Sequence, residues 1–76
     1  MSLRFTLPGP TRMTLRIIDV TGREIVVLRR GQFPGGRHTA TWNGRDGAGQ
    51  VVATGMYFAI LDSGSGRATT RFAVLR

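Results

Sequence analysis

Strict alternation of apolar and polar side chains is the feature of this sequence that most limits its fold. Residues 3–7 read LRFTL, and residues 12–17 read RMTLRI. Successive side chains of a β-strand point to opposite faces, so a period of two gathers the apolar residues on one face. We therefore predict a half-buried strand in each segment, with its arginines and threonines facing away from the core.

Glycine and proline divide the rest of the chain into short segments, and no sustained helical period is visible. Residues 19–22 are predicted to form a turn that joins a strand at 11–19 to one at 23–28. Residues 51–52 are expected to form a very short strand. Residues 56–61 are apolar at every position, which predicts a strand paired on both sides in the middle of a sheet.

The last predicted strand covers residues 67–75. Its alternation assigns Ala68, Thr70, Phe72 and Val74 to the core face, and Arg67, Thr69 and Arg71 to the outer face. The count is then about seven short strands at roughly ten-residue spacing, which is typical of an antiparallel β-sandwich. At 76 residues the chain is expected to be a single domain, residues 1–76.

The sequence offers little for catalysis. The sole histidine, His38, alternates in phase with Ala40 and Trp42, so we expect it at the edge of the core or bonded to a loop carbonyl. There is no cysteine, the loop at 44–49 lacks the lysine and helix of a phosphate-binding loop, and calcium-loop spacing is missing. We therefore predict no enzyme activity, no cofactor and no metal site.

The net charge is +7, and arginine supplies all of the positively charged side chains. Such a surface can contact phosphate or carboxylate groups, so polyanion or nucleic-acid binding is one candidate function. Phe5, Phe72, Trp42 and Tyr57 all have the core phase, and the face of Phe58 is left open, so base stacking has no obvious platform; this disfavours nucleic acid and favours a solvated face. The outward arginines are predicted to be Arg12 and Arg16, with Arg4 beside them, and Arg67 and Arg71 on the last strand.

The longest apolar runs, such as residues 25–28, are far too short to span a bilayer, and no signal-peptide pattern is visible. The sequence therefore predicts no transmembrane segment.

Several spaced motifs resemble a known family. They are GRH at 36–38, WNGRD at 42–46, DVTGRE at 19–24, and the single residues Gly49, Val52, Gly55 and Tyr57. Together they resemble the immunoglobulin-like domain shared by the flagellar hook-capping protein and by C-terminal modules of many secreted bacterial proteins. The second group includes the type A sorting domains of the type IX secretion system. The resemblance extends from Leu3 to Arg76 and implies an immunoglobulin-like or fibronectin type III-like sandwich.

The resemblance also implies structural roles for matching residues. Trp42 would fill the core, and Tyr57 would anchor a corner through its hydroxyl. Gly22 and Gly55 would hold backbone geometries that a side chain opposes.

The function implied first is a C-terminal sorting or attachment module of a secreted or cell-surface bacterial protein. Its partner would be secretion or attachment machinery, or domains of the parent protein. The end of the last strand, at Val74, Leu75 and Arg76, would be the recognised segment. The alternative is a structural assembly domain like the hook cap, with self-association through edge strands. One departure is that sorting domains often carry an Asn-Pro-Phe segment before the first strand, and none precedes Leu3.

Overall fold

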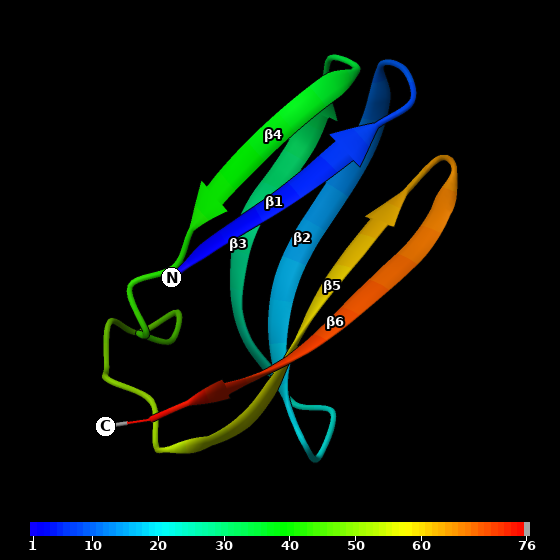
Figure 1. The fold of residues 1–76 in the computed structure, drawn as a ribbon. Helices are drawn as coiled ribbons and strands as arrows, with labels where there is room; N and C mark the ends of the chain where they lie inside the picture. Colours follow the sequence, from blue (N-terminus) through cyan, green and yellow to red (C-terminus); the bar gives the residue numbers. More distant parts are fainter. Residues whose placement is uncertain (76) are drawn as a thin grey trace.

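The computed structural model describes residues 1–75, which contain six β-strands and no helix. The strands form two antiparallel sheets, one of β1 and β4 and the other in the order β3-β2-β5-β6 (Figure 1). The predicted immunoglobulin-like sandwich is confirmed. The strands are β1 (Ser2–Leu7), β2 (Thr11–Asp19), β3 (Glu24–Phe33), β4 (Gly36–Thr41), β5 (Gly55–Ser63) and β6 (Gly66–Val74).

Within the described residues the strands number six rather than about seven. Val51 makes only an isolated antiparallel bridge with Arg45, so residues 51–52 do not form a strand of their own. The short excursion between β4 and β5 is a loop that folds back against β3, where the Gly47 N–H donates to the Ile25 carbonyl at 3.0 Å. Seven short apolar segments therefore yield six strands and one docked loop.

The period-two pattern produces the core directly. In β2, the side chains of Met13, Leu15 and Ile17 are buried. Arg12, which precedes them and points to the other face, is exposed. Ile17 is 0 % exposed and belongs to the core cluster. Because buried apolar area is the main source of stability in a domain this small, the burial of these alternating residues stabilises the fold.

β5 is paired on both sides, with β2 and with β6, as its apolar composition predicts. Ile60 is 7 % exposed although it lies on the outer face of the four-stranded sheet. Its register partner on β2 is Arg16, and a long arginine stem can cover apolar surface while its guanidinium stays in water. The outer face therefore buries some apolar area without a third layer.

Two aspartates build the same turn twice. The Oδ1 atom of Asp19 accepts hydrogen bonds from the N–H groups of Thr21 (2.9 Å) and Arg23 (3.1 Å). The N–H of Gly22 donates to the Asp19 carbonyl at 3.0 Å, and the N–H of Asp19 donates to the Arg23 carbonyl. Gly22 has a φ of 85°, which glycine adopts without steric cost. Asp19 therefore satisfies the backbone of the β2–β3 turn.

Asp46 repeats the backbone hydrogen bonds of this arrangement. Its Oδ1 accepts from the N–H groups of Ala48 and Gln50, both at 2.9 Å, and the Gly49 N–H donates to its carbonyl at 3.0 Å. Gly49 has a φ of 83°, close to that of Gly22. The shared pattern is aspartate followed three residues later by glycine, so the glycine-rich loop is a turn.

The expectation for the first half of β6 is wrong. Ala68 and Thr70 lie opposite Leu61 and Ala59 in the register and so have the predicted phase, but both are exposed. Phe72, further along the strand, is partly buried against the core. The reason is that the smaller sheet has only two strands. β1 is its last strand, and no further strand among residues 1–75 covers Ala68 and Thr70.

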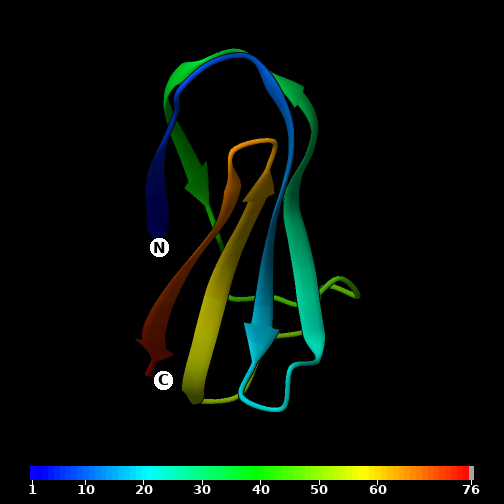
Figure 2. The ribbon, with the colours of Figure 1, turned by 90° about the vertical axis from the view of Figure 1, so that its right-hand side faces the viewer.

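Figure 2, turned by 90° from Figure 1, shows both chain ends on the same side of the molecule. That side carries one edge strand of each sheet, β1 of the smaller and β6 of the larger.

We expect Trp42→Ala to lower the free energy of unfolding by about 3–5 kcal/mol, the usual cost of truncating a large buried aromatic. Trp42 is 3 % exposed and is in the core cluster. Urea unfolding followed by circular dichroism measures the change. Val20→Ala is the control, because Val20 is 69 % exposed and its truncation should change stability by less than about 0.5 kcal/mol. Equal midpoints for the two variants would contradict the role given to Trp42.

The Asp19 turn predicts a pH dependence of stability. Hydrogen bonds to the carboxylate, first from the Thr21 hydroxyl (2.6 Å), lower the pKa of Asp19. A lowered folded-state pKa gives stability that is present above the unfolded-state pKa of about 3.9 and is lost as pH falls through the folded-state value. Asp19→Asn should therefore remove part of the acid destabilisation seen in urea midpoints between neutral and acidic pH. Parallel curves for the two proteins would contradict this account.

Candidate interaction surface

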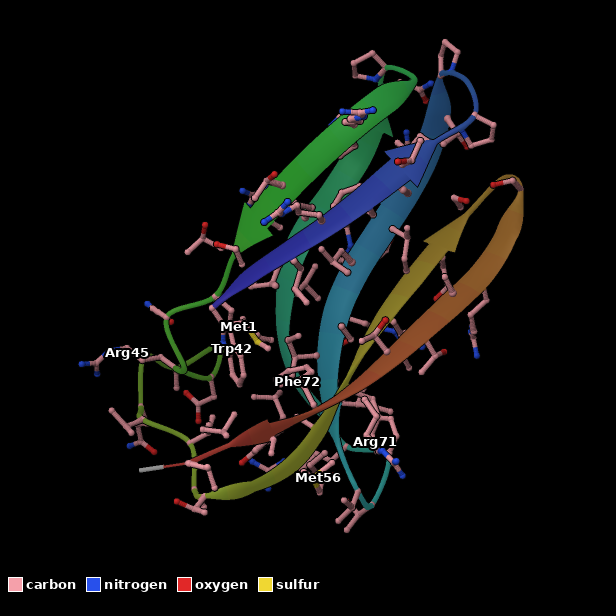
Figure 3. The ribbon with its side chains drawn as sticks, in the orientation of Figure 1. Met1, Trp42, Arg45, Met56, Arg71 and Phe72 are labelled. Carbon is pink, nitrogen blue, oxygen red and sulfur yellow. The ribbon has the colours of Figure 1, made fainter. Side chains whose placement is uncertain are left out.

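Three aromatic side chains join the two sheets at the end where the chain termini lie. The Trp42 ring is 5.8 Å, centroid to centroid, from both Tyr57 and Phe72, in edge-to-face geometry. Trp42 follows β4 of the small sheet, whereas Tyr57 and Phe72 belong to β5 and β6 of the large one. Figure 3 shows Trp42 and Phe72 on the core side of β6 and Arg71 on its other side.

The polar atoms of this cluster are satisfied by backbone carbonyls. The Tyr57 hydroxyl donates to the Ala53 carbonyl at 2.6 Å, four residues upstream, and the Trp42 indole N–H donates to the Arg45 carbonyl at 2.9 Å. The first bond fixes the corner that leads into β5, and the second fixes the loop after β4. Both residues therefore have structural contacts, and their polar groups are not left for a ligand.

Gly55 does not have the role expected of it. Its φ is not positive, and a Cβ built on it would meet nothing within 4 Å. A side chain would therefore fit, in contrast to Gly22 with its φ of 85°. A tight contact with backbone occurs instead at Gly35, where a Cβ would be 2.8 Å from the Cα of Gly9. That contact packs the β1–β2 turn against the β3–β4 turn, where the chain twice changes sheet.

The arginines do not form one row. Arg12 and Arg16 lie on the outer face of β2, and Arg67 and Arg71 lie on the same face of the large sheet, on β6. Arg4 does not lie beside Arg12 and Arg16 as expected, because β1 pairs with β4 in the other sheet, where Arg4 faces Thr39. Alternation within a strand predicts its faces, but not its neighbours.

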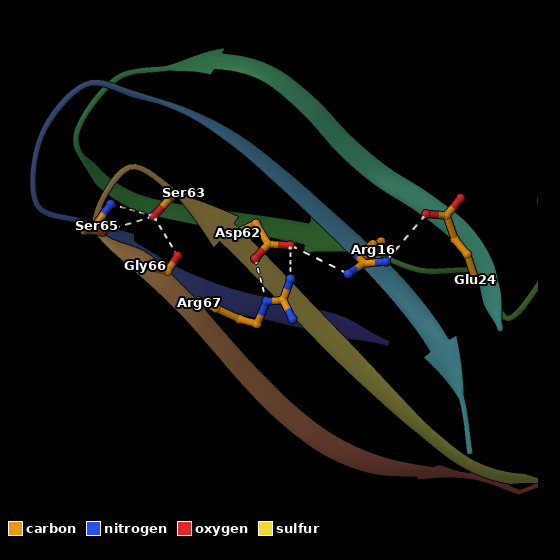
Figure 4. A network of polar contacts seen from close by, with 7 residues as sticks. All are labelled: Arg16, Glu24, Asp62, Ser63, Ser65, Gly66 and Arg67. Atoms are coloured by element: carbon orange, nitrogen blue, oxygen red, sulfur yellow. Dashed lines mark hydrogen bonds and ion pairs between the residues drawn. The ribbon is translucent and has the colours of Figure 1, made fainter. Parts of the chain in front are cut away.

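The carboxylate of Asp62, which we call the acidic centre, neutralises part of the positive charge on the outer face of the large sheet (Figure 4). The Arg67 Nε–H donates a hydrogen bond to the Asp62 carboxylate at 2.6 Å. An Arg16 guanidinium nitrogen lies 3.7 Å from the same carboxylate. Arg16 also reaches Glu24 at 4.0 Å. The hydrogen bond to Asp62 raises the pKa of Arg67 further above its already high value. Arg16 and Arg67 are therefore engaged with acids of the chain itself and are less available to an external anion.

The imidazole of His38 and the carboxylates of Asp19 and Asp46 are engaged in packing or in turn hydrogen bonds. His38 stacks on Phe5 with 5.4 Å between ring centroids, and its Nε2 lies 2.8 Å from the Pro34 carbonyl oxygen, as expected for a histidine at the core edge. Residues 1–75 contain no cluster of three metal-ligating side chains and no buried side-chain polar atom without a partner. No helix that could cross a membrane is present in this part of the chain.

The end of β6 leaves an exposed apolar side chain. Val74 is partly buried and packs against the core, whereas Leu75 is 84 % exposed. Arg76, the third residue of the predicted recognition segment, lies outside the described residues. Among the described strands β6 pairs only with β5, which leaves its other edge free.

The chain start extends the small sheet by one pair. The Trp42 N–H donates to the Met1 carbonyl at 2.8 Å, and the Met1 amino group donates to the Trp42 carbonyl at 3.0 Å. β1 has a free edge on its other side, because its one partner among the described strands is β4. Sequence reasoning did not find this edge or the uncovered residues Ala68 and Thr70. The small and polar side chains at these two core-phase positions were the available signal.

Comparison with known proteins agrees with this architecture. The family model of the FlgD Ig-like domain matches residues 1–66. No match is found among curated protein sequences. A solved structure of PorZ, described as an essential bacterial surface component of the type-IX secretion system of Porphyromonas gingivalis, superimposes with a TM-score of 0.62 at 24 % identity. The match covers 99 % of this chain but 11 % of the PorZ chain, so it concerns one domain of a much longer protein.

The acidic centre predicts a small, salt-sensitive coupling between Arg16 and Asp62. Both side chains are partly exposed, so a double-mutant cycle with Arg16→Gln and Asp62→Asn should give about 0.2–1 kcal/mol in urea unfolding at low salt. The coupling should shrink at high ionic strength because exposed charges are screened. Arg12→Gln combined with Asp62→Asn is the matched control, and an equal coupling in that cycle would contradict the assigned pair.

Proposed function

Because this chain belongs to the FlgD Ig-like domain family, we propose that it is a non-enzymatic sorting or attachment module of a secreted or cell-surface bacterial protein. In this proposal, secretion or attachment machinery binds the end of β6. The observation that carries it is Leu75, an apolar side chain that is 84 % exposed directly after an edge strand.

The occupied polar groups support a non-enzymatic role. The His38 imidazole faces a carbonyl, and the carboxylates of Asp19 and Asp46 each accept hydrogen bonds from turn N–H groups. Asp62 is held between two arginines. A general acid or base needs a free group within hydrogen-bond reach of a substrate, and these groups are already engaged.

The edge of β6 supports docking of a protein. An edge strand presents unpaired N–H and C=O groups to which an extended segment can add, and neighbouring side chains then give specificity. The likeness to a domain of PorZ, a surface component of a secretion system, is compatible with such a setting.

A structural assembly role is the second candidate, favoured by the family match itself, since the model that matches is that of the FlgD domain. In that case the same edges would contact a scaffold or further copies of the domain. Polyanion binding has less support, because Arg16 and Arg67 are already paired with acids.

A reporter fusion tests the sorting proposal. The chain of residues 1–76 is fused behind a reporter in a bacterium that has a type IX system. We expect export of the intact fusion and strongly reduced export of Leu75→Asp, since the exposed leucine is the recognised group. Val20→Asp is the matched control, because Val20 is also exposed (69 %) but lies in the β2–β3 turn.

Circular dichroism first establishes that both variants fold. Retention of the intact fusion in the periplasm, or equal export of the two variants, would overturn the sorting proposal and make the assembly role the better explanation.

A further inference from the structure

We propose that the space between β1 and β6 is a docking site for an extended, acidic strand of a partner protein, which adds to the free edge of β1. This site lies on a different strand from the end of β6 discussed above, and it does not depend on the export role.

The first observation is an uncovered part of the core face. Ala68 and Thr70 point to the same side of the large sheet as the buried Ala59, yet both are exposed. A strand in a two-layer sandwich normally buries this face against the opposite sheet. Here the opposite sheet stops at β1, one strand short of covering β6.

The second observation is that the space is hollow at both ends. One cavity, of about 150 Å³, is lined by Thr6 and Leu7 of β1, by Leu61 of β5 and by residues 65–68. Another, of about 350 Å³, lies between Met1 and Trp42 on one side and residues 73–75 on the other. Both join β1 or its extension to β6, so a strand running along β1 would pass over both.

The third observation is the edge itself. β1 pairs with β4 along its whole length, from Ser2 opposite Thr41 to Leu7 opposite Gly36, and its other side has no strand partner in residues 1–75. It contains no proline and no bulge, which are two of the devices that block strand addition, although its Arg4 is a charge that disfavours most added strands. An added strand would give the smaller sheet three strands and would place every second side chain over Ala68 and Thr70.

The positive charge on the outer face of the smaller sheet favours an added strand that carries acidic side chains. On its outer face, Arg4 of β1 and Arg37 of β4 are exposed, and neither strand contains an acidic residue. An added strand that alternates acidic and apolar residues would place carboxylates beside Arg4 and apolar side chains in the space over β6. Opposite charges on adjacent strands are stabilising, and like charges directly opposite one another are destabilising.

The same charges disfavour a second copy of this chain as the occupant. Two β1 strands paired edge to edge in phase would bring Arg4 close to its own counterpart. Each copy also carries a net charge of +7, so association would oppose a large repulsion. A different, acidic chain is therefore the occupant to which the surface is complementary.

The test uses the full chain, labelled with ¹⁵N, and a capped peptide of alternating glutamate and valine. We expect saturable shifts of the amide signals of β1 and of Ala68 and Thr70, with those of β3, the opposite edge of the large sheet, unchanged. A peptide with lysine in place of glutamate should bind about fivefold more weakly.

Two variants of β6 locate the site on one face of one strand. Ala68→Glu should weaken binding by more than about tenfold, because it places a charge where the apolar side chains dock. Thr69→Glu is the matched control. Thr69 is also exposed, and it lies on the outer face opposite Ile60, so the substitution should leave the affinity within about twofold.

A charge exchange tests the proposed contact with Arg4. Arg4→Glu should reverse the preference between the glutamate and lysine peptides, whereas Arg12→Glu on the other sheet should not. Lack of saturable binding, or shifts confined to β3 or to the outer face of β6, would overturn the proposal. Shifts of β1 that grow with protein concentration alone would also overturn it, because they would identify a second copy as the occupant.

Discussion

The edge-to-face contacts of Trp42 with Tyr57 and Phe72 are the interaction on which the two-sheet arrangement depends. In residues 1–75 the smaller sheet has two strands, too few to form an independently stable sheet in water. It is retained because its buried residues and this indole pack against the larger sheet. The hydrogen bonds of Met1 and Arg45 to Trp42 then tie both the chain start and the long loop to the same point.

Local sequence determines where the strands and turns of this protein lie, but it does not determine which strands pair with each other. Alternation in residues 3–7 and 12–17 predicts strands and faces correctly because a strand's period is a property of its own backbone. The turn at Asp19 is also local, since its hydrogen bonds lie within five residues. Arg4 was misplaced because pairing of β1 with β4 joins residues far apart in the chain, and no local pattern encodes that partner.

The same limit applies to burial. Ala68 and Phe72 have the same phase on β6, and only the extent of the opposite sheet makes one exposed and the other partly buried. Likewise, the arginines of the outer face could be assigned to a face from the sequence, but the position of Asp62 between Arg16 and Arg67 follows from the register of β2, β5 and β6. Residue type predicts the face of the sheet on which a side chain lies, and the topology determines which strand or side chain packs against that face.

The unequal size of the two sheets connects the fold to its surface. A four-stranded sheet packed against a two-stranded one leaves an inner face that cannot be fully covered, and it leaves that face next to a free edge. The large sheet can tolerate this because the uncovered positions are held by Ala68 and Thr70, which lose little by being in water. Larger apolar residues there would strengthen association with any strand but would also expose an apolar patch next to an open edge, which promotes aggregation. Small residues on the inner face, combined with Arg4 on the outer face of β1, therefore favour a partner selected by charge and strand geometry over indiscriminate self-association.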